Sequence, residues 1–463
     1  MVRLFNVHFS RRTLQLFLVE SLLLVSALLL PVFFHFGKNP TNPLVMDYRA
    51  WKIAAVAGIC LLFLYFNNLY SPSWVKERRK AHSRFLQALG AAAIVLGLLY
   101  CFFPGMELYR GFSITGVSLV AVVLISNRAM FVAREEAMQE KKLVVILGDG
   151  SLARSVARAI EERADLGFQV AGYVGGMWKS AVDSEAPRRL GSAEELVSIV
   201  EQVKPAHVIV AMTERRSNLP VNDLLVLKTS GVAVRDGVEF YEHLSGKLPV
   251  ELIRPSSLIF AHGFQASPIA VICRRILSFL LAAIGLLVSL PLFALIVLAI
   301  RLDSPGPIIF RQRRVGYRGE HFTLYKFRTM EVDADRGGYA RPAEHNDPRV
   351  TRVGRVLRRL RLDEIPQMYN ILMGEMHFVG PRPFVPEQEM ECAAQIPLYK
   401  LRWSVRPGAT GWAQVQRGYC ASLRDNTDKL AYDLFYIKNR SISLDLLILF
   451  KTIKIVLAAQ GGR

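Results

Sequence analysis

Cysteine is scarce in this chain, and the few cysteines do not form a metal-binding pattern. The 463 residues include five cysteines, and no two are spaced as a CxxC pair: Cys60, Cys101, Cys273, Cys392 and Cys420. Neither a zinc site, which normally uses such pairs, nor the dense disulfide framework of small secreted domains is indicated. We expect buried thiols.

Acidic residues are also few. The chain has 39 Asp and Glu against 58 Lys and Arg, a formal net charge of +19, which predicts an anionic partner. Hydrophobic residues make up 52% of the chain and the mean hydropathy is +0.26, too apolar for a wholly soluble protein. We therefore expect a lipid bilayer and phosphorylated small molecules as partners, and no nucleic acid. The length predicts a membrane part and at least two soluble parts.

No cleavable signal peptide is recognisable, because the first apolar run continues well beyond a typical signal core. Four runs of near 20 apolar residues predict four transmembrane helices within residues 1–133: Leu14–Phe36, Ile53–Leu69, Phe85–Phe103 and Gly111–Phe131. Cations precede the first run and crowd the loop after the second, so the positive-inside rule predicts a cytoplasmic N-terminus and cytoplasmic soluble domains. Glu20, inside the first run, is expected to be packed and hydrogen-bonded.

Residues 134–262 are predicted to form a Rossmann-like α/β domain. The stretch KLVVILGDGSLARSVARAIEE is a hydrophobic strand, a glycine turn and a helix, with Gly148, Gly150 and Ala153 at the G-x-G-x-x-G/A positions. Such a turn brings backbone N–H groups toward a phosphate, so these three residues are candidate nucleotide ligands. The pattern continues with three strands and two helices: Phe168–Val174, His207–Ala211, Val232–Arg235, Ala193–Gln202 and Val221–Thr229.

One feature of a dinucleotide site is missing from this domain. The acid that holds ribose at the end of the second strand is absent, and the chain there reads GYVGG, Gly172–Gly176. Two interpretations of residues 134–262 therefore stay open: a structural or regulatory domain, and a nucleotide-binding domain.

A fifth apolar run, Ile276–Ile300, follows Arg274-Arg275 and is interrupted by Pro291. Proline inside a helix removes a hydrogen bond and bends the axis. A full crossing would export the arginine-rich region that follows, against the positive-inside rule. We predict a re-entrant membrane helix hairpin at residues 274–301, with a straight fifth transmembrane helix as the alternative.

The segment from Pro348 to Pro383 carries the acidic pair Asp363-Glu364 at the end of the run VTRVGRVLRRLRL. Apolar residues at three- and four-residue spacing predict an amphipathic helix with arginines on its other faces, suited to a membrane interface. The cations are expected to lower the pKa of both carboxyl groups and to hold a phosphate. The alternative is an ordinary surface helix closed by an acidic turn.

Three motifs carry a resemblance to a known family: SPGPIIFRQRRVGYRGEHFTLYKFRTM, LRLDEIPQMYNILMGEMHFVGPRP and VRPGATGWAQV. Together they resemble the bacterial sugar transferases, the monotopic polyprenyl-phosphate phosphoglycosyl transferases, over residues 270–463. The resemblance implies a mainly α, membrane-associated catalytic domain of the bacterial inner membrane. It implies transfer of a sugar phosphate from a UDP-sugar, of glucose or galactose type, to undecaprenyl phosphate, with Mg²⁺ and a covalent aspartyl intermediate, at the start of exopolysaccharide or O-antigen synthesis.

The resemblance also implies roles for particular residues. Asp363 matches the nucleophile, and Glu364 falls to magnesium binding or phosphate support, so both are candidate metal ligands. Candidate phosphate and substrate ligands lie in the matching motifs: Lys326, Arg328, Arg358, Arg382, Arg406 and Asp433. Family members commonly have Ser-Pro at the helix break, whereas this chain has Leu290-Pro291. Residues Leu444–Leu457 form a further helix, expected to dock on a surface.

Two other functions compete with this interpretation. A membrane-bound NAD-dependent nucleotide-sugar dehydratase or epimerase would need a Tyr-x-x-x-Lys pair, and the match here is Tyr48–Lys52, far upstream of the glycine turn. A membrane scaffold without catalytic activity would leave Asp363 and Glu364 replaceable. Trp412 and Tyr436 could lie at the lipid headgroups or in a core. A homodimer through the middle domain is a further expectation.

Overall fold

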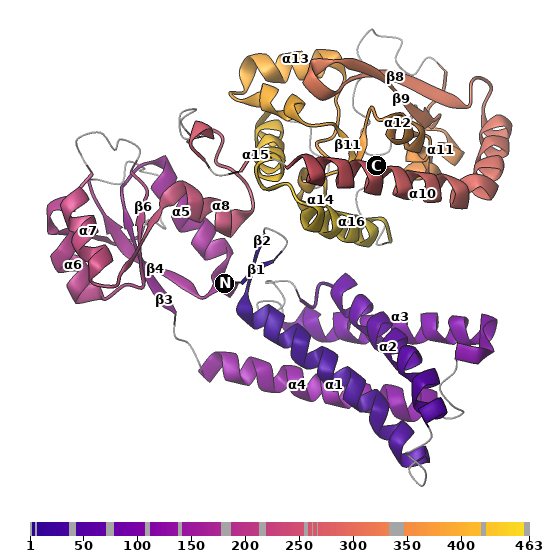
Figure 1. Cartoon of the computed structure of the whole chain (residues 1–463), viewed down its shortest axis with the longest axis horizontal. Helices are drawn as coiled ribbons and strands as arrows, with labels where there is room; N and C mark the ends of the chain where they lie inside the picture. The colour runs from indigo at the N-terminus through magenta and orange to yellow at the C-terminus, as the bar shows by residue number, and fades with distance from the viewer. Residues whose placement is uncertain are drawn as a thin grey trace.

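The computed structural model describes residues 2–4, 7–36, 43–70, 78–106, 112–137, 141–176, 187–212, 219–253, 258–261, 263–265, 267–332, 347–417 and 423–457. Figure 1 shows three bodies: a helical bundle, an α/β domain and a mainly helical C-terminal domain. A short antiparallel pair, β1 (Val2–Leu4) and β2 (Val7–Phe9), precedes the bundle.

The bundle is formed by four helices that share one apolar core: α1 (Arg11–Phe36), α2 (Pro43–Phe66), α3 (Arg78–Phe102) and α4 (Phe112–Ala137). A short 3₁₀ turn, η2 (Pro104–Met106), follows α3. At 24–26 residues each helix is about 36–39 Å long, enough to cross a bilayer. In the described residues, α1 and α3 have long apolar spans, whereas the apolar parts of α2 and α4 are shorter, Trp51–Phe66 and Leu119–Phe131.

A buried ion pair lies inside this bundle. Glu20 of α1 has no solvent exposure, and Arg128 of α4 donates to its two oxygens over 2.6 and 2.9 Å. Tyr70, after α2, donates to the same carboxylate. The expectation that Glu20 is packed and hydrogen-bonded is confirmed, and the pair joins the first and last helices of the bundle.

The middle domain is a parallel five-stranded sheet in the order β5-β4-β3-β6-β7, the order of a doubly wound sheet. Its strands are β3 (Lys142–Leu147), β4 (Phe168–Val174), β5 (Arg189–Gly191), β6 (His207–Val210) and β7 (Ala233–Asp236). The expected strands and helices are confirmed to within a few residues.

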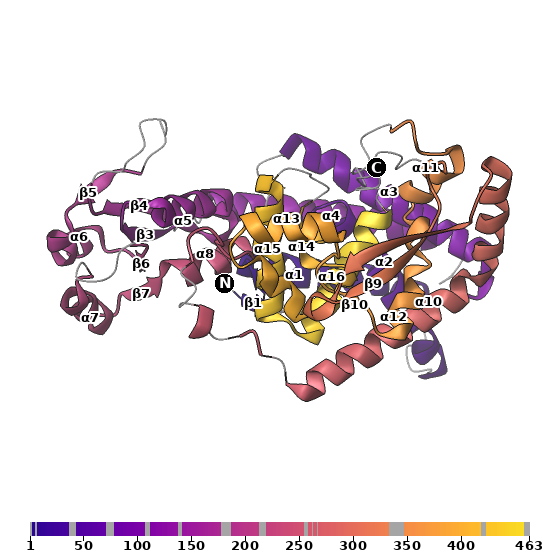
Figure 2. The same ribbon diagram turned by 90° about the horizontal axis from the view of Figure 1, so that it is seen from above.

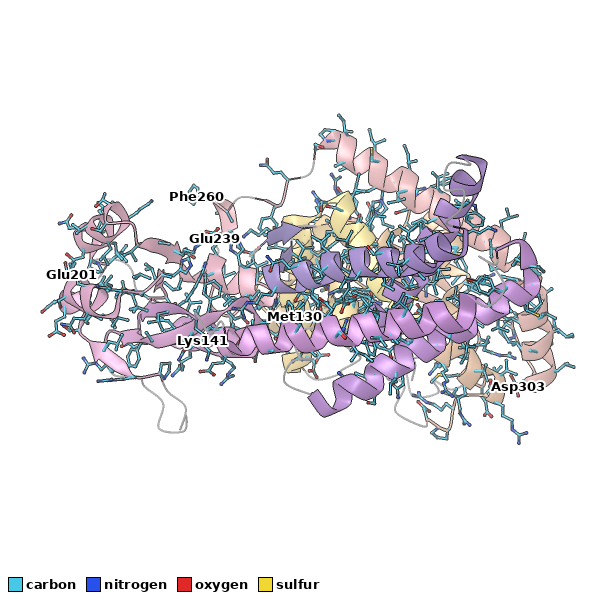
Figure 3. The ribbon with its side chains drawn as sticks, turned by 90° about the horizontal axis from the view of Figure 1, so that it is seen from below. Met130, Lys141, Glu201, Glu239, Phe260 and Asp303 are labelled. Atoms are coloured by element: carbon cyan, nitrogen blue, oxygen red, sulfur yellow. The ribbon has the colours of Figure 1, made fainter. Side chains whose placement is uncertain are left out.

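Helices cover both faces of this sheet. The cores on the two faces show α5 (Ser151–Glu162) and α8 (Gly237–Ser245) on one side, and α6 (Leu196–Val203) and α7 (Val221–Thr229) on the other. Two 3₁₀ turns, η3 (Ala164–Leu166) and η4 (Ala193–Glu195), precede β4 and α6. In Figure 3, Lys141 marks the passage from α4 into the sheet, and Glu201 lies on α6 at the end of the molecule away from Asp303.

The C-terminal domain begins with the long helix α10 (Pro268–Asp303). An antiparallel hairpin follows, β8 (Ile309–Val315) and β9 (His321–Phe327), joined through η5 (Tyr317–Gly319). The remaining elements are α11 (Arg352–Arg359), η6 (Leu362–Glu364), α12 (Gln367–Met373), β10 (His377–Val379), α13 (Pro386–Gln395), η7 (Tyr399–Ser404), β11 (Gly408–Thr410), α14 (Trp412–Gln416), α15 (Leu423–Asn439) and α16 (Ile442–Leu457). Strands β10 and β11 pair in parallel.

Helix α10 contains Pro291 in its interior and bends in its C-terminal third, as Figures 1 and 2 both show. Ser289 donates to the carbonyl of Leu286 over 3.0 Å, so the hydroxyl before the proline satisfies a carbonyl in the preceding turn. Helix α10 therefore runs continuously through Pro291 as one bent helix. The re-entrant path through a membrane stays a prediction.

Several placements differ from expectation. Cys60 and Cys392 are buried, but Cys101 on α3 and Cys273 on α10 are exposed, because they lie on the outer faces of apolar helices. Cys420 lies outside the described residues. Trp412 and Tyr436 are almost completely buried, at 0% and 1% exposure, so both belong to the core of the C-terminal domain.

Candidate active site

The acidic pair lies where an amphipathic helix ends. Thr351 caps α11 by accepting from the N–H of Gly354 over 3.0 Å. Leu357 packs in a small core with residues of α10 and β9, whereas Val356 is 56% exposed. Arg361 adopts a left-handed conformation, φ 56°, which ends the helix and turns the chain into η6. The predicted apolar stripe is thus divided between the core and an exposed edge.

Glu364 is surrounded by cations. Arg382 donates to its Oε1 over 2.7 Å, and Lys326 donates to the same atom over 3.1 Å. Arg361 Nη1 lies 3.8 Å from Oε2. Although burial alone would raise the pKa of Glu364, these charges hold it well below its usual range, so the carboxylate stays ionised. The expectation of a lowered pKa is confirmed for Glu364.

Asp363 is in a different environment. It is 7% exposed, and Lys326 Nζ lies 3.6 Å from its Oδ2. Burial, together with the negative charge of Glu364, outweighs the neighbouring cations and raises the pKa of Asp363 above its usual value. The expectation of a lowered pKa is therefore wrong for Asp363, because desolvation depends on depth in the fold, which the run of arginines did not reveal.

Three of the predicted phosphate ligands gather at this pair. Lys326 comes from the end of β9, and Arg382 follows β10. Arg358 lies on the last turn of α11, where its Nε donates to Thr329 Oγ1 over 2.8 Å, and its charge acts on Asp363. Cations from three elements therefore converge on two carboxylates that are adjacent in sequence.

Arg328 and Arg406 are placed elsewhere. Arg328 is 6% exposed and donates to the carbonyl oxygens of Ser304 and Pro305 over 2.6 and 2.9 Å, which ties the end of α10 to the end of β9. Arg406 stacks over the ring of Tyr317, with its guanidinium carbon 5.9 Å from the ring centre. Arg328 thus has a bracing role in this fold.

Asp433 is connected to the acidic pair indirectly, through Arg402 and Arg382. It is 2% exposed and accepts from Arg402 Nε over 2.9 Å, while Arg402 Nη1 donates to Glu389 over 2.9 Å. Arg402 Nη2 donates to the backbone carbonyl of Arg382 over 2.8 Å. This buried network, Glu389, Arg402 and Asp433, fixes the residue that contacts Glu364. Sequence reasoning missed Glu389 and Arg402, which lie between the recognisable motifs.

Comparison with known proteins identifies the family to which the chain belongs. The sequence profile described as "Bacterial sugar transferase" matches residues 269–459. The UDP-glucose:undecaprenyl-phosphate glucose-1-phosphate transferase of Xanthomonas campestris pv. campestris is 31% identical over 353 residues, 73% of this chain and 70% of that relative. The chain belongs to the bacterial sugar transferase family.

Two other members of the bacterial sugar transferase family match over smaller shares of their length. The UDP-N-acetylgalactosamine-undecaprenyl-phosphate N-acetylgalactosaminephosphotransferase of Aeromonas hydrophila is 42% identical over 226 residues, 48% of this chain and 52% of that relative. The undecaprenyl-phosphate glucose phosphotransferase of Komagataeibacter xylinus is 36% identical over 321 residues, 67% of this chain and 58% of that relative. This chain thus spans between half and two thirds of these two relatives.

In this member of the bacterial sugar transferase family, packing accounts for the glycine turn of the middle domain. Gly148 has φ 127°, and a Cβ there would lie 2.7 Å from the carbonyl oxygen of Ala211. A Cβ on Gly176 would lie 2.6 Å from Asp149 Oδ2, so this carboxylate occupies the space beside the turn. Gly150 caps α5 without a side chain, and Ala153 is fully buried. A carboxylate beside the turn disfavours a second anion there.

The Tyr-x-x-x-Lys pair that a dehydratase or epimerase would need lies in a different body from the glycine turn. Tyr48 and Lys52 are on α2 of the bundle, whereas Gly148 follows β3 of the middle domain. The structure does not bring this pair to the glycine turn.

Proposed function

We propose that this chain transfers a sugar 1-phosphate from a UDP-sugar to undecaprenyl phosphate, releasing UMP and forming an undecaprenyl-diphosphate-sugar. The observation that carries the proposal is the unequal carboxylate pair. Glu364 is held by Arg382 and Lys326, while Asp363 has a raised pKa and a weaker contact with Lys326. A carboxylate with fewer partners and less stabilisation of its charge is the better nucleophile. The names of the relatives support the choice of substrates.

In the first step, an Asp363 oxygen attacks the β-phosphorus of the UDP-sugar. The bond between that phosphorus and the bridging oxygen breaks, UMP leaves, and the sugar phosphate becomes an acyl phosphate on Asp363. Lys326, Arg358 and Arg382 are positioned to offset the negative charge on the phosphoryl oxygens. Glu364 holds Lys326 and Arg382 in place.

In the second step, a phosphate oxygen of undecaprenyl phosphate attacks the same phosphorus. The acyl phosphate bond breaks, Asp363 regains its carboxylate, and the lipid carries the new diphosphate. The enzyme alternates between a free form and a form that carries the sugar phosphate on Asp363, which predicts ping-pong kinetics.

We propose Mg²⁺ as the cofactor. In the described residues, no group of three or more His, Cys, Asp or Glu side chains forms a metal cage. Mg²⁺ does not need one, since it binds through one or two carboxylates and substrate phosphates. Asp363 fits as a ligand, while Glu364 Oε1 already faces Arg382 and Lys326, and its Oε2 lies 3.8 Å from Arg361 Nη1. The ion would neutralise the diphosphate of the UDP-sugar.

We also propose that α10 enters the membrane and returns to the cytoplasmic face of the bacterial inner membrane. Its 36 residues are the most apolar span in the described chain. One face contacts the rest of the C-terminal domain on both sides of Pro291, through Arg274 with Asp445 and Phe293 with Phe327. A helix covered by a polar domain along one side is poorly suited to a full crossing. Leu287 and Val288, before the bend, are 68% and 72% exposed and face outward.

The middle domain is proposed to be a Rossmann-like structural unit that supports the transferase. Glu242 of α8 is 4% exposed and accepts from Lys438 over 2.6 Å and from Asn439 over 2.8 Å. Trp412 donates to the carbonyl of Gly246 over 2.8 Å. These contacts join α8 and the residue after it to Trp412 in the third motif and to the end of α15. A homodimer through this domain stays a prediction.

Intact-mass spectrometry tests the covalent step. Purified protein is incubated with UDP-glucose, UDP-galactose or UDP-N-acetylgalactosamine and Mg²⁺ without lipid acceptor. Wild type should gain one sugar phosphate and release about one equivalent of UMP, as a covalent intermediate requires. Asp363→Asn should gain none, and Glu387→Gln, at an exposed carboxylate of α13, should behave as wild type. If Asp363→Asn transferred sugar phosphate to undecaprenyl phosphate at the wild-type rate, the proposed mechanism would be wrong.

A further inference from the structure

Three arginines gather beside the first turns of α10: Arg275 on the helix, Arg406 before β11 and Arg440 between α15 and α16. The ring of Tyr317 lies under Arg406 and also acts electrostatically on Arg440. The charges of Arg406 and Arg275 help to lower the pKa of His377 on β10. The backbone N–H of His377 donates to the carbonyl of Pro407 over 2.9 Å. The three arginines therefore share one region of the C-terminal domain.

Their positive charge is not neutralised within the described part of the chain. Arg274 next to them is paired with Asp445 at 2.6 Å, but none of the three has a carboxylate within ion-pair distance there. Arg275 donates to the carbonyls of Ile371 and Leu372, and Arg440 Nη2 donates to the carbonyl of Phe264 over 3.2 Å. Among the described residues, the guanidinium of Arg406 lies over the Tyr317 ring. This region carries three net positive charges.

An unsatisfied polar atom lies in the same region. His377 is 9% exposed, and its Nε2 has no hydrogen-bond partner among the described residues. Burial and the surrounding arginines lower the pKa of His377 to about 3, so the ring is neutral at physiological pH. Arg440 Nε is likewise buried without a partner. Buried polar atoms of this kind are rare in folded proteins and suggest a missing ligand.

The side of α10 next to Arg275 is apolar and exposed. Ile272 and Phe279, one helical turn away in each direction, are 58% and 45% exposed, and Ile276 is 52% exposed. A ligand with an anionic head and hydrocarbon chains matches this combination of charge and apolar surface.

We propose that Arg275, Arg406 and Arg440, with His377 Nε2, bind the phosphodiester headgroup of an anionic membrane phospholipid whose acyl chains lie along α10. This rests on the placement of α10 in the membrane proposed above. Arg275 contacts the carbonyls of Ile371 and Leu372 at the C-terminal end of α12, whereas Asp363 precedes the start of this seven-residue helix, which is about 10 Å long. An acceptor phosphate would have to approach Asp363 to roughly 3–3.5 Å for attack. The site therefore suits a resident lipid better than the acceptor.

Native mass spectrometry of the full chain, released from nanodiscs with equal amounts of phosphatidylglycerol and phosphatidylcholine, tests the site. Wild type should retain phosphatidylglycerol in preference to phosphatidylcholine. The double variant Arg406→Gln/Arg440→Gln should lose about tenfold of the retained phosphatidylglycerol, given two lost charge-assisted contacts. Arg313→Gln, which removes an exposed arginine on β8, is the matched control and should retain it. Arg440→Lys keeps the charge and should retain most of the lipid, which separates loss of binding from misfolding.

Several outcomes would overturn this site. Equal retention of phosphatidylglycerol by the double variant and wild type would do so, as would equal retention of both lipids by wild type. A raised KM for undecaprenyl phosphate in the double variant with unchanged phosphatidylglycerol retention would assign the arginines to the acceptor instead. The lipid assay uses no UDP-sugar, so failure of the covalent step leaves its result interpretable.

Discussion

At the scale of single residues, two adjacent carboxylates have opposite pKa shifts because their surroundings differ. Glu364 faces Arg382 and Lys326, whereas Asp363 is desolvated beside Lys326 and the negative charge of Glu364. The raised pKa makes the unprotonated fraction of Asp363 more sensitive to acid than that of an ordinary aspartate. Under the proposed mechanism, this sensitivity should be visible in the first step.

We expect UMP release without acceptor to fall on acidification at a pH above about 3.9, the usual value for aspartate. Lys326 is the largest charge that lowers the pKa of Asp363, so Lys326→Met should move the acid limb to higher pH, whatever its effect on the maximal rate. The pH profile of single-turnover UMP release measures both. An acid limb at the same pH in the variant and wild type would contradict the assignment of Asp363.

A second expectation at this scale concerns the buried network of Glu389, Arg402 and Asp433. Asp433→Asn leaves Arg402 with less compensation for its charge in a site where it is 5% exposed. Breaking a buried ion pair from one side costs about 3–5 kcal/mol of stability. Thermal unfolding should show a clearly lowered Tm, while the exposed Glu387→Gln changes stability by less than about 0.5 kcal/mol. A Tm equal to wild type would show that water or another residue compensates Arg402.

At the scale of elements, α10 combines a continuous helix with an internal proline. Pro291 cannot donate a backbone hydrogen bond, and α10 bends in its C-terminal third (Figure 2). The bend lets both ends of the helix contact the same domain, through Arg274 near the start and Asp303 at the end, which accepts from the N–H of Val353 over 3.0 Å.

We expect labels at the two ends of α10 to react from the same side of the membrane. In a variant without native cysteines, single cysteines at Ser267 and Ser304 should both react with a membrane-impermeant maleimide only after the cytoplasmic face is opened. Adding Pro291→Ala restores a helical hydrogen bond and should expose part of the Ser304 position to the opposite face. Labelling of Ser304 from the outer face before any substitution would indicate a full crossing.

At the scale of the whole molecule, the three bodies meet at the C-terminal domain. Lys454 of α16 donates to the carbonyl of Tyr65 over 3.0 Å, and Phe450 packs on the Tyr65 ring at 4.9 Å, so α16 docks on the end of α2. Figure 1 shows α16 on the side of the C-terminal domain that faces the bundle. The sequence predicts that this helix docks on a surface, and in the structure it contacts the chain's own bundle. Glu242 supplies the corresponding contact from the middle domain.

We expect Glu242→Gln to loosen the contact between the middle and C-terminal domains. The substitution weakens a nearly buried ion pair with Lys438 at 2.6 Å, whereas Glu239→Gln on the same helix affects a side chain that is 64% exposed. Hydrogen exchange should rise at least severalfold in α8 and the end of α15 for Glu242→Gln and stay unchanged for Glu239→Gln. Equal exchange in the two variants would mean that Trp412 and its neighbours hold the interface without the ion pair.

The sequence by itself determined the order of the three parts and most element boundaries in the middle domain. Hydrophobic periodicity and apolar run length are local properties, so they could be read from the chain. The tertiary structure decided which cations face Asp363 and Glu364. It assigned Arg328 to the end of α10, Asp433 to Arg402, and Trp412 to the core. These outcomes depend on burial and on contacts between segments distant in sequence, because desolvation and charge act through space.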